Sequence, residues 1–191
     1  HLFLSSMSNI KFPGKIAVMG GGSWATAIAK ILLVNNDHIY WYMRRQEQID
    51  EFMCLGKNPS YLSTVKFDTN RITFTSKITE VVKTADTLIF AMPSPFLKGH
   101  LKKLKAPLTE KFVVSAIKGI VPDENMIMST FFHEIYGVPY ENIAVLAGPC
   151  HAEEIAMERL SYLTIACKDR ERSRLFAQNL ASHYIRTATT D

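Results

Sequence analysis

The sequence has little cysteine, and its cysteines follow no recognisable pairing. Cys54, Cys150 and Cys167 are scattered along 191 residues and form no C-x-x-C pair. An odd and scattered set argues against a disulfide framework and against a structural zinc site. We therefore expect a protein of a reducing compartment, the cytoplasm, that holds no metal.

Long apolar runs and a strong charge bias are also missing. No run approaches the ~18 residues that span a bilayer, and the apolar stretch at residues 2–4 is too short for a signal-peptide core. We expect residues 1–6 to be a leader or vector remnant and residues 7–191 to form one domain. The formal charge of +4 is spread along the chain and is densest at residues 98–105. This cluster lacks the interleaved aromatics typical of nucleic-acid binding, whereas a mildly positive balance suits a small anionic ligand.

What the sequence does contain is a regular alternation of short β-rich runs and amphipathic segments. Most of the β-rich runs are nearly continuously apolar, as strands covered on both faces must be. We expect strands at residues 15–19, 38–42, 71–75, 87–91, 112–116, 143–146, 162–166 and 184–188. We expect helices at residues 23–34, 46–55, 96–104, 125–136, 152–157 and 170–181. The alternation predicts an α/β fold with a doubly wound, mostly parallel sheet of about eight strands.

A glycine-rich turn follows the first predicted strand. Residues 20–25 read Gly-Gly-Gly-Ser-Trp-Ala and fit the pattern G-x-G-x-x-A. In this pattern Gly20 permits a tight turn, Gly22 lets the backbone approach a pyrophosphate, and the small Ala25 lets the helix pack closely on the strand. The N–H groups at the helix N-terminus attract phosphate. A glycine triplet alone is weak evidence, but its place between a strand and a helix favours a dinucleotide-binding turn.

The second predicted strand ends without the acid by which NAD-selective domains hold the ribose 2′-hydroxyl. Arg44 and Arg45 stand there instead. Their guanidinium groups could pair with a 2′-phosphate and stack on adenine, although an arginine pair after a strand is also often simply exposed. We therefore expect NADP to be accepted, with NAD as the alternative cofactor.

Other predicted strand ends also carry candidate site residues. Met-Pro-Ser-Pro at residues 92–95 forms a rigid turn that places Phe96 near the cofactor, or else a simple turn into a helix. Lys118, followed by a glycine, could hold a substrate oxygen or the carboxamide region of the cofactor, or else lie in solvent. Cys150 has no partner base that would make it a nucleophile, and His151 and Glu154 lack the spacing of metal ligands.

Taken together, these segments resemble the N-terminal part of bacterial NAD(P)-dependent glycerol-3-phosphate dehydrogenase. The resemblance is carried by five motifs in the order of that family and covers almost the whole chain after Met7. They are the glycine turn with Ser23-Trp24, Asn-Pro-Ser-Tyr-Leu at residues 58–62, Met-Pro-Ser at 92–94, Ser-Ala-Ile-Lys-Gly at 115–119 and Gly-Pro-Cys-His-Ala-Glu-Glu at 148–154.

The resemblance implies a reversible hydride transfer between NAD(P)H and dihydroxyacetone phosphate, which gives sn-glycerol 3-phosphate for phospholipid synthesis. It implies cofactor contacts from Ser23, Trp24, Arg44, Lys118 and Ala152. It also implies that Lys118, Gly148 and Cys150 contact the substrate. The full-length enzyme is then expected to be a homodimer that contacts neither nucleic acid nor a membrane.

Two departures from the family pattern bear on these expectations. Cys150 stands where Ser or Thr is expected and is a poorer hydrogen-bond donor. The family's proton-transferring lysine lies in a helical C-terminal domain, and this sequence ends at Asp191, before it. Reduction of a carbonyl needs a proton as well as a hydride, so we expect this chain to bind the cofactor with negligible turnover.

Two other interpretations compete with this one. A hydroxyacid or ketopantoate reductase would have a similar cofactor domain, but the segments at residues 58–62 and 148–154 speak against it. A non-catalytic module that senses NAD(P) and signals through a partner would also lack a catalytic half. The length of the encoding gene beyond residue 191 distinguishes a sensing module from an enzyme.

Overall fold

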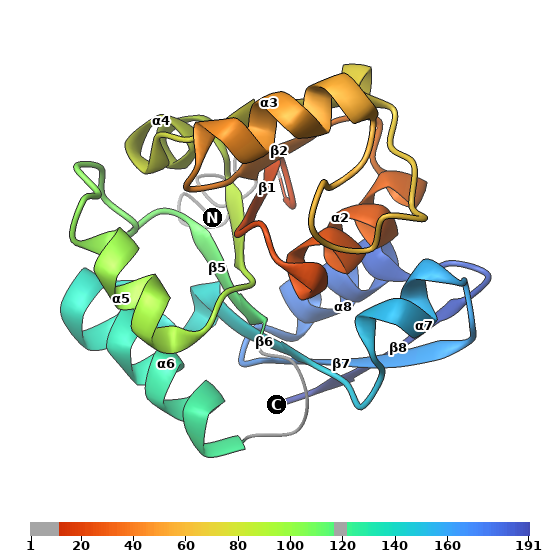
Figure 1. Ribbon diagram of the computed structural model, residues 1–191. Helices are drawn as coiled ribbons and strands as arrows, with labels where there is room; N and C mark the ends of the chain where they lie inside the picture. Colours follow the sequence, from red (N-terminus) through yellow and green to blue (C-terminus); the bar gives the residue numbers. More distant parts are fainter. Residues whose placement is uncertain (1–11, 117–121) are drawn as a thin grey trace.

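The computed structural model describes residues 12–116 and 122–191. They form a single eight-stranded sheet with helices on both faces (Figure 1). The strands are β1 (Ile16–Met19), β2 (Ile39–Tyr42), β3 (Ile72–Thr75), β4 (Thr87–Phe90), β5 (Phe112–Ala116), β6 (Ile143–Ala147), β7 (Ser161–Cys167) and β8 (Ile185–Thr190). The expected α/β, doubly wound sheet of about eight strands is confirmed.

The sheet order is β3-β2-β1-β4-β5-β6-β7-β8. All neighbouring pairs are parallel except β6 and β7, which run antiparallel. The chain therefore winds outward from β1 in one direction to β3 and then returns to continue from β4 in the other. The space between these two halves, at the carboxyl ends of the strands, is where open parallel sheets bind ligands.

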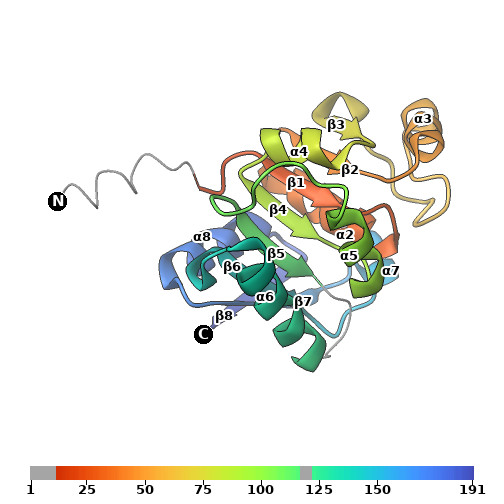
Figure 2. The same cartoon turned by 90° about the vertical axis from the view of Figure 1, so that its left-hand side faces the viewer.

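The helices lie between the strands in sequence and cover the two faces of the sheet (Figures 1 and 2). They are α2 (Ser23–Asn35), α3 (Gln46–Leu55), α4 (Ile78–Thr84), α5 (Ser94–Leu101), α6 (Pro122–Tyr136), α7 (Ala152–Ala156) and α8 (Arg170–Leu180). No described helix is both long and apolar enough to cross a membrane.

The sheet separates two hydrophobic cores. Along β1, Ile16 and Val18 contribute to one core, and Ala17 and Met19 contribute to the other. The first core contains buried side chains of α2, α3, α7 and α8, and the second contains those of α4, α5 and α6. Burial on both faces explains why the central strands β1, β4 and β5 are apolar or small-residue runs rather than alternating ones. The strands toward the far edge differ, because β7 alternates buried and exposed residues and β8 is mostly exposed.

One segment between two strands, for which no helix was predicted, forms a helix. No helix was expected between residues 75 and 87, yet α4 occupies Ile78–Thr84. The segment is only seven residues long and rich in β-branched side chains, which favour strands. Ile78, Val81 and Val82 are buried at helical spacing against the sheet, so tertiary packing outweighs the local preference.

Several helix ends also differ from expectation. α5 begins at Ser94 and ends at Leu101, instead of covering residues 96–104. The α6 helix begins at Pro122, three residues before the predicted start, because proline is well tolerated in the first turn of a helix.

Candidate cofactor-binding site

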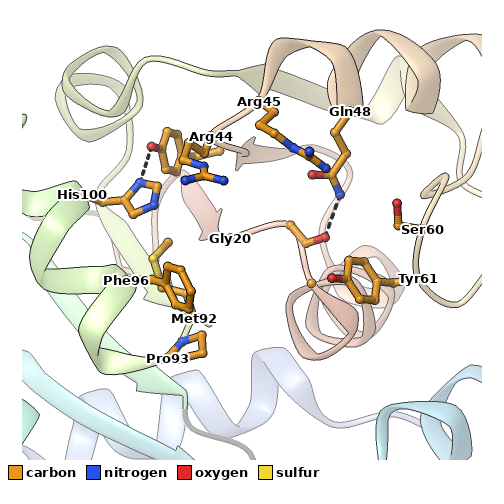
Figure 3. A pocket seen from close by; sticks show the side chains of 13 residues that line it. Gly20, Arg44, Arg45, Gln48, Ser60, Tyr61, Met92, Pro93, Phe96 and His100 are labelled. Atoms are coloured by element: carbon orange, nitrogen blue, oxygen red, sulfur yellow. Dashed lines mark hydrogen bonds between the residues drawn. The ribbon is translucent and has the colours of Figure 1, made fainter.

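A pocket opens at the carboxyl ends of three neighbouring strands. β1 leads to Gly20, β2 leads to Arg44 and β4 leads to Met92, and all three residues line one cavity of about 260 Å³ (Figure 3). Because β1 lies between β2 and β4, this is the position where the winding of the sheet reverses. The pocket therefore coincides with the usual ligand site of a doubly wound sheet.

Gly20 has a conformation that only glycine adopts readily. Its φ is +132°, and a Cβ atom at this position would lie 2.8 Å from the carbonyl oxygen of Ala91. The Gly20 carbonyl oxygen accepts a 2.6 Å hydrogen bond from Nε1 of the buried Trp41. The tight turn predicted at the first glycine is confirmed, and the close approach of β1 and β4 explains it.

Gly22 meets a different requirement. Its φ of −86° is accessible to any residue, and a Cβ atom there would have no described atom within 4 Å. Neither backbone strain nor a protein neighbour explains a glycine at this position. Close approach by a ligand would explain it.

The N-terminus of α2 presents uncapped backbone N–H groups at the turn. Its N-cap residue is Gly22, which has no side chain to accept a hydrogen bond, and its first turn contains no acidic residue. The first intrahelical hydrogen bond runs from the N–H of Thr26 to the carbonyl oxygen of Gly22. The N–H groups of Ser23, Trp24 and Ala25 therefore have no partner within the helix and can bind an anion.

A buried asparagine holds the glycine turn in place through hydrogen bonds. Asn58 is fully buried, and its side-chain amide donates to the Gly21 carbonyl oxygen at 3.1 Å and to Thr26 Oγ1 at 2.9 Å. Its Oδ1 accepts the backbone N–H groups of Ser60 and Tyr61. The loop after α3 is thereby tied to the turn.

Gln48 of α3 makes a second connection to the same carbonyl group. Its Nε2 donates to the Gly21 carbonyl oxygen at 2.8 Å (Figure 3). A Cβ atom at Gly21 would lie 2.9 Å from Gln48 Oε1, so the middle glycine makes room for this side chain. Two side chains from separate elements thus hold the turn in one conformation.

Charged and aromatic side chains surround the pocket mouth. Arg44 and Arg45 are both exposed and line the pocket, as predicted from their place at the end of β2. Phe96 of α5 is 59% exposed and lines the opposite side (Figure 3). An exposed aromatic ring facing guanidinium groups across a cleft can stack on a flat, apolar ligand group.

A hydrogen-bonded pair, Tyr42 and His100, connects β2 to α5 beside Arg44. The Tyr42 hydroxyl lies 2.7 Å from His100 Nδ1. Burial lowers the pKa of His100, and the charges of Arg44 and Lys103 lower it further. Burial raises the pKa of Tyr42, so its hydroxyl keeps its proton and can donate to a neutral His100.

The remaining predicted cofactor contacts are less exposed. Ser23 begins α2 and is partly exposed, whereas the Trp24 ring is 6% exposed and its Nε1 has no hydrogen-bond partner among the described residues. Ala152 is completely buried where α7 packs against α2. Trp24 can therefore reach a ligand through its backbone N–H rather than through its ring.

The predicted substrate residues lie at the end of β6. A Cβ atom at Gly148 would lie 2.6 Å from the Tyr162 carbonyl oxygen, so packing against β7 already requires glycine there. Cys150 is 9% exposed, its side chain belongs to the first core, and burial raises the pKa of its thiol. This burial argues against a thiolate nucleophile and against an exposed thiol contact. Lys118 lies outside the described residues.

Four pocket-side residues were given no role by sequence reasoning. They are Tyr42 of β2, Gln48 of α3, Asn58 of the loop after α3 and His100 of α5, and only the fold brings these elements together. Asn58 lies in a motif that carried the family resemblance. Its place in that motif was the one sequence signal that could have singled out Asn58.

Comparison with known proteins agrees with the geometry of this site. Residues 15–173 match the family described as NAD-dependent glycerol-3-phosphate dehydrogenase N-terminus. A glycerol-3-phosphate dehydrogenase [NAD(P)+] of Corynebacterium aurimucosum is 34% identical over 176 residues, covering 91% of this chain and 52% of that protein. One of Ectopseudomonas mendocina is 37% identical over 156 residues, covering 82% of this chain and 45% of that protein.

The solved structures give the same result. A glycerol-3-phosphate dehydrogenase of Plasmodium falciparum superposes with a TM-score of 0.80 at 25% identity, covering 100% of this chain and 55% of that one. The chain thus spans about half the length of the relatives that it matches. With the family match extending over most of its length, the chain belongs to the NAD-dependent glycerol-3-phosphate dehydrogenase family and corresponds to the N-terminal part of its members.

Proposed function

We propose that this chain binds NADP or NAD with the pyrophosphate against the turn between β1 and α2. One observation carries the proposal: the first turn of α2 offers three N–H groups without helical partners, beside a glycine whose missing side chain no protein atom explains. Backbone N–H groups and the helix dipole together favour a bound phosphate. Gly20 and Gly22 shape the turn, and Ser23 and Trp24 supply N–H groups.

The adenosine half of the cofactor extends toward β2 and α5. Arg44 and Arg45 flank it at the end of β2, and Phe96 offers an exposed ring on the other side. The nicotinamide half extends toward β5 and β6, where the family resemblance assigns cofactor contacts to Lys118 and Ala152.

The reaction that we propose is hydride transfer between NAD(P)H and dihydroxyacetone phosphate to give sn-glycerol 3-phosphate. Membership of the family supports this proposal. Lys118, Gly148 and Cys150 would face the substrate. The buried thiol of Cys150 leaves its backbone as the more suitable contact. We further propose that the protein acts in the cytoplasm as a homodimer.

The substrate is tested by following NADPH oxidation with dihydroxyacetone phosphate, and with ketopantoate as the substrate of the nearest rival. The assay uses the 191-residue chain and the full-length product of its gene. We expect oxidation only with dihydroxyacetone phosphate and only in the full-length product, with cofactor binding in both. Normal turnover by the 191-residue chain would refute the role assigned to the family's lysine.

The same assay separates an enzyme from a sensing module. Oxidation with ketopantoate instead would assign the chain to a different reductase. Tight cofactor binding with no turnover on either substrate by the full-length product would favour a module that senses NAD(P).

A further inference from the structure

A second hollow adjoins the cofactor pocket on the side of α5. It has a volume of about 260 Å³ and shares Arg44, Phe96 and His100 with the pocket, and Lys103 lines the hollow but not the pocket. Its other lining residues are Pro95 and Gly99, so three of the six carry or can carry a positive charge and none is acidic.

The cations of this hollow have no acidic partner. No ion pair joins Arg44 or Lys103 to a carboxylate of the described residues. Both cations act on the His100 ring, because their charges are among the causes that lower its pKa. Three basic groups, one just after β2, one in α5 and one just after α5, therefore line one small volume without a counter-charge, which is typical of a site for a polyvalent anion.

We propose that Arg44, His100 and Lys103 form a subsite for the 2′-phosphate of NADP. This inference rests on the proposed cofactor site. The hollow lies beyond the carboxyl end of β2, where a doubly wound domain recognises the adenosine ribose. An arginine in place of an acid at that position accommodates the 2′-phosphate, and His100 of α5 and Lys103 just after this helix add two further hydrogen-bond donors.

The two arginines consequently have different roles. Arg44 lines both the pocket and the second hollow, whereas Arg45 lines the pocket alone. In Figure 3 Arg44 lies on the His100 side and Arg45 lies on the Gln48 side. Arg44 binds the 2′-phosphate, and Arg45 contacts the rest of the adenosine half.

Tyr42 orients His100 for this role. Its hydroxyl is hydrogen-bonded to Nδ1, so Nε2 is the ring nitrogen that can donate to a phosphate oxygen. In the neutral tautomer that accepts the Tyr42 hydroxyl proton at Nδ1, the ring proton resides on Nε2. When the ring is protonated, both nitrogens carry protons and Nε2 still donates.

The test is a calorimetric titration of the 191-residue chain with NADPH and with NADH. Lys103→Gln is compared with Lys102→Gln, an identical charge change at an exposed neighbour that does not line the hollow. We expect Lys103→Gln to weaken NADPH binding about 3- to 10-fold and Arg44→Gln to weaken it at least about 10-fold, with NADH changed less than about 2-fold. Lys102→Gln should leave both affinities within about 2-fold.

Each outcome bears on one proposal. Equal effects of Lys103→Gln and Lys102→Gln, or equal losses for NADPH and NADH, would overturn the subsite while leaving the cofactor pocket intact. Failure of the folded wild-type chain to bind either dinucleotide would overturn the proposed function itself.

Discussion

At the residue scale, the two outer glycines of the turn have different physical reasons to be glycine. Gly20 has a positive φ and lies against the carbonyl group of Ala91, so the fold itself requires it. Gly22 has an ordinary φ and no protein neighbour in the direction of its absent side chain. The fold therefore accounts for the first glycine, whereas only the proposed ligand contact accounts for the second.

Two alanine substitutions separate these roles. Gly20→Ala should lower the free energy of unfolding by about 1–3 kcal/mol, because it strains the backbone and contacts Ala91. Gly22→Ala should change it by less than about 1 kcal/mol yet weaken NADPH binding at least about 10-fold. Urea unfolding and calorimetric titration measure the two quantities. Normal NADPH affinity in Gly22→Ala would contradict the proposed pyrophosphate contact.

The His100 ring predicts a pH dependence of cofactor affinity. In the free protein its pKa lies below the ordinary value, because burial and the charges of Arg44 and Lys103 disfavour the charged ring. A bound 2′-phosphate favours the charged ring and raises this pKa, so binding takes up a proton at intermediate pH. The contribution of His100 to NADPH affinity should be full below its free-state pKa and fall as the pH rises through its bound-state pKa.

The measurement is NADPH affinity between about pH 5 and pH 8, in wild type and His100→Gln. The phosphate itself loses charge below about pH 6, so the ratio of the two affinities is the informative quantity. This ratio should decrease toward high pH for NADPH and stay nearly constant for NADH. A constant ratio for both would exclude His100 from the phosphate subsite.

At the element scale, the loop after α3 supports the glycine turn, although it is distant in sequence. Asn58 connects this loop to the turn and to α2 through its hydrogen bonds with Gly21 and Thr26. Because it is fully buried, each lost partner leaves a polar group without water. The loop and the turn should therefore behave as one structural unit.

Asn58→Ala tests this coupling. We expect the free energy of unfolding to fall by about 2 kcal/mol and NADPH affinity to fall with it, because the Ser60 and Tyr61 N–H groups and Thr26 lose a partner. Asn70→Ala, at an exposed position, is the matched control and should change neither quantity appreciably. Unaltered cofactor affinity in a folded Asn58→Ala chain would show that the turn does not depend on this loop.

The predictability of the elements from sequence follows from their packing. The central strands β1, β4 and β5 were predictable because burial on both faces makes them apolar, and the glycine turn because its pattern is local. The α4 helix was missed, since its β-branched residues favour a strand locally and only contact with the sheet makes them helical. The pairing of Tyr42 with His100, and the reach of Asn58 to the turn, depend on tertiary contacts between distant segments.

At the scale of the whole molecule, two groups of strand ends hold different parts of the proposed site. The segments that follow β1, β2 and β4 carry the turn, the arginines and the second hollow. The ends of β5 and β6 lead to the segments that the family resemblance assigns to the nicotinamide and the substrate. Binding of one dinucleotide along the carboxyl ends of both groups of strands would connect them, so cofactor binding should stabilise the domain as a unit.

This predicts a stability increase with ligand concentration. At a free NADPH concentration 100 times its Kd, the free energy of unfolding should rise by about 2.7 kcal/mol, provided that the unfolded chain does not bind. Thermal unfolding monitored by circular dichroism measures this shift. Gly22→Ala should show a much smaller increase at the same NADPH concentration, and an equal increase would place the cofactor elsewhere.

Cofactor binding at the glycine turn is tested most directly by a fluorescence titration of the 191-residue chain with NADPH and NADH. Trp41 donates a hydrogen bond to the Gly20 carbonyl oxygen, and Trp24 lies in the first turn of α2, so both indoles report on the turn. We expect a saturable change in tryptophan emission with both cofactors, with tighter binding of NADPH and strongly weakened binding in Gly22→Ala. No change with either cofactor, in a chain that circular dichroism shows to be folded, would contradict the central claim that this turn binds a nicotinamide dinucleotide.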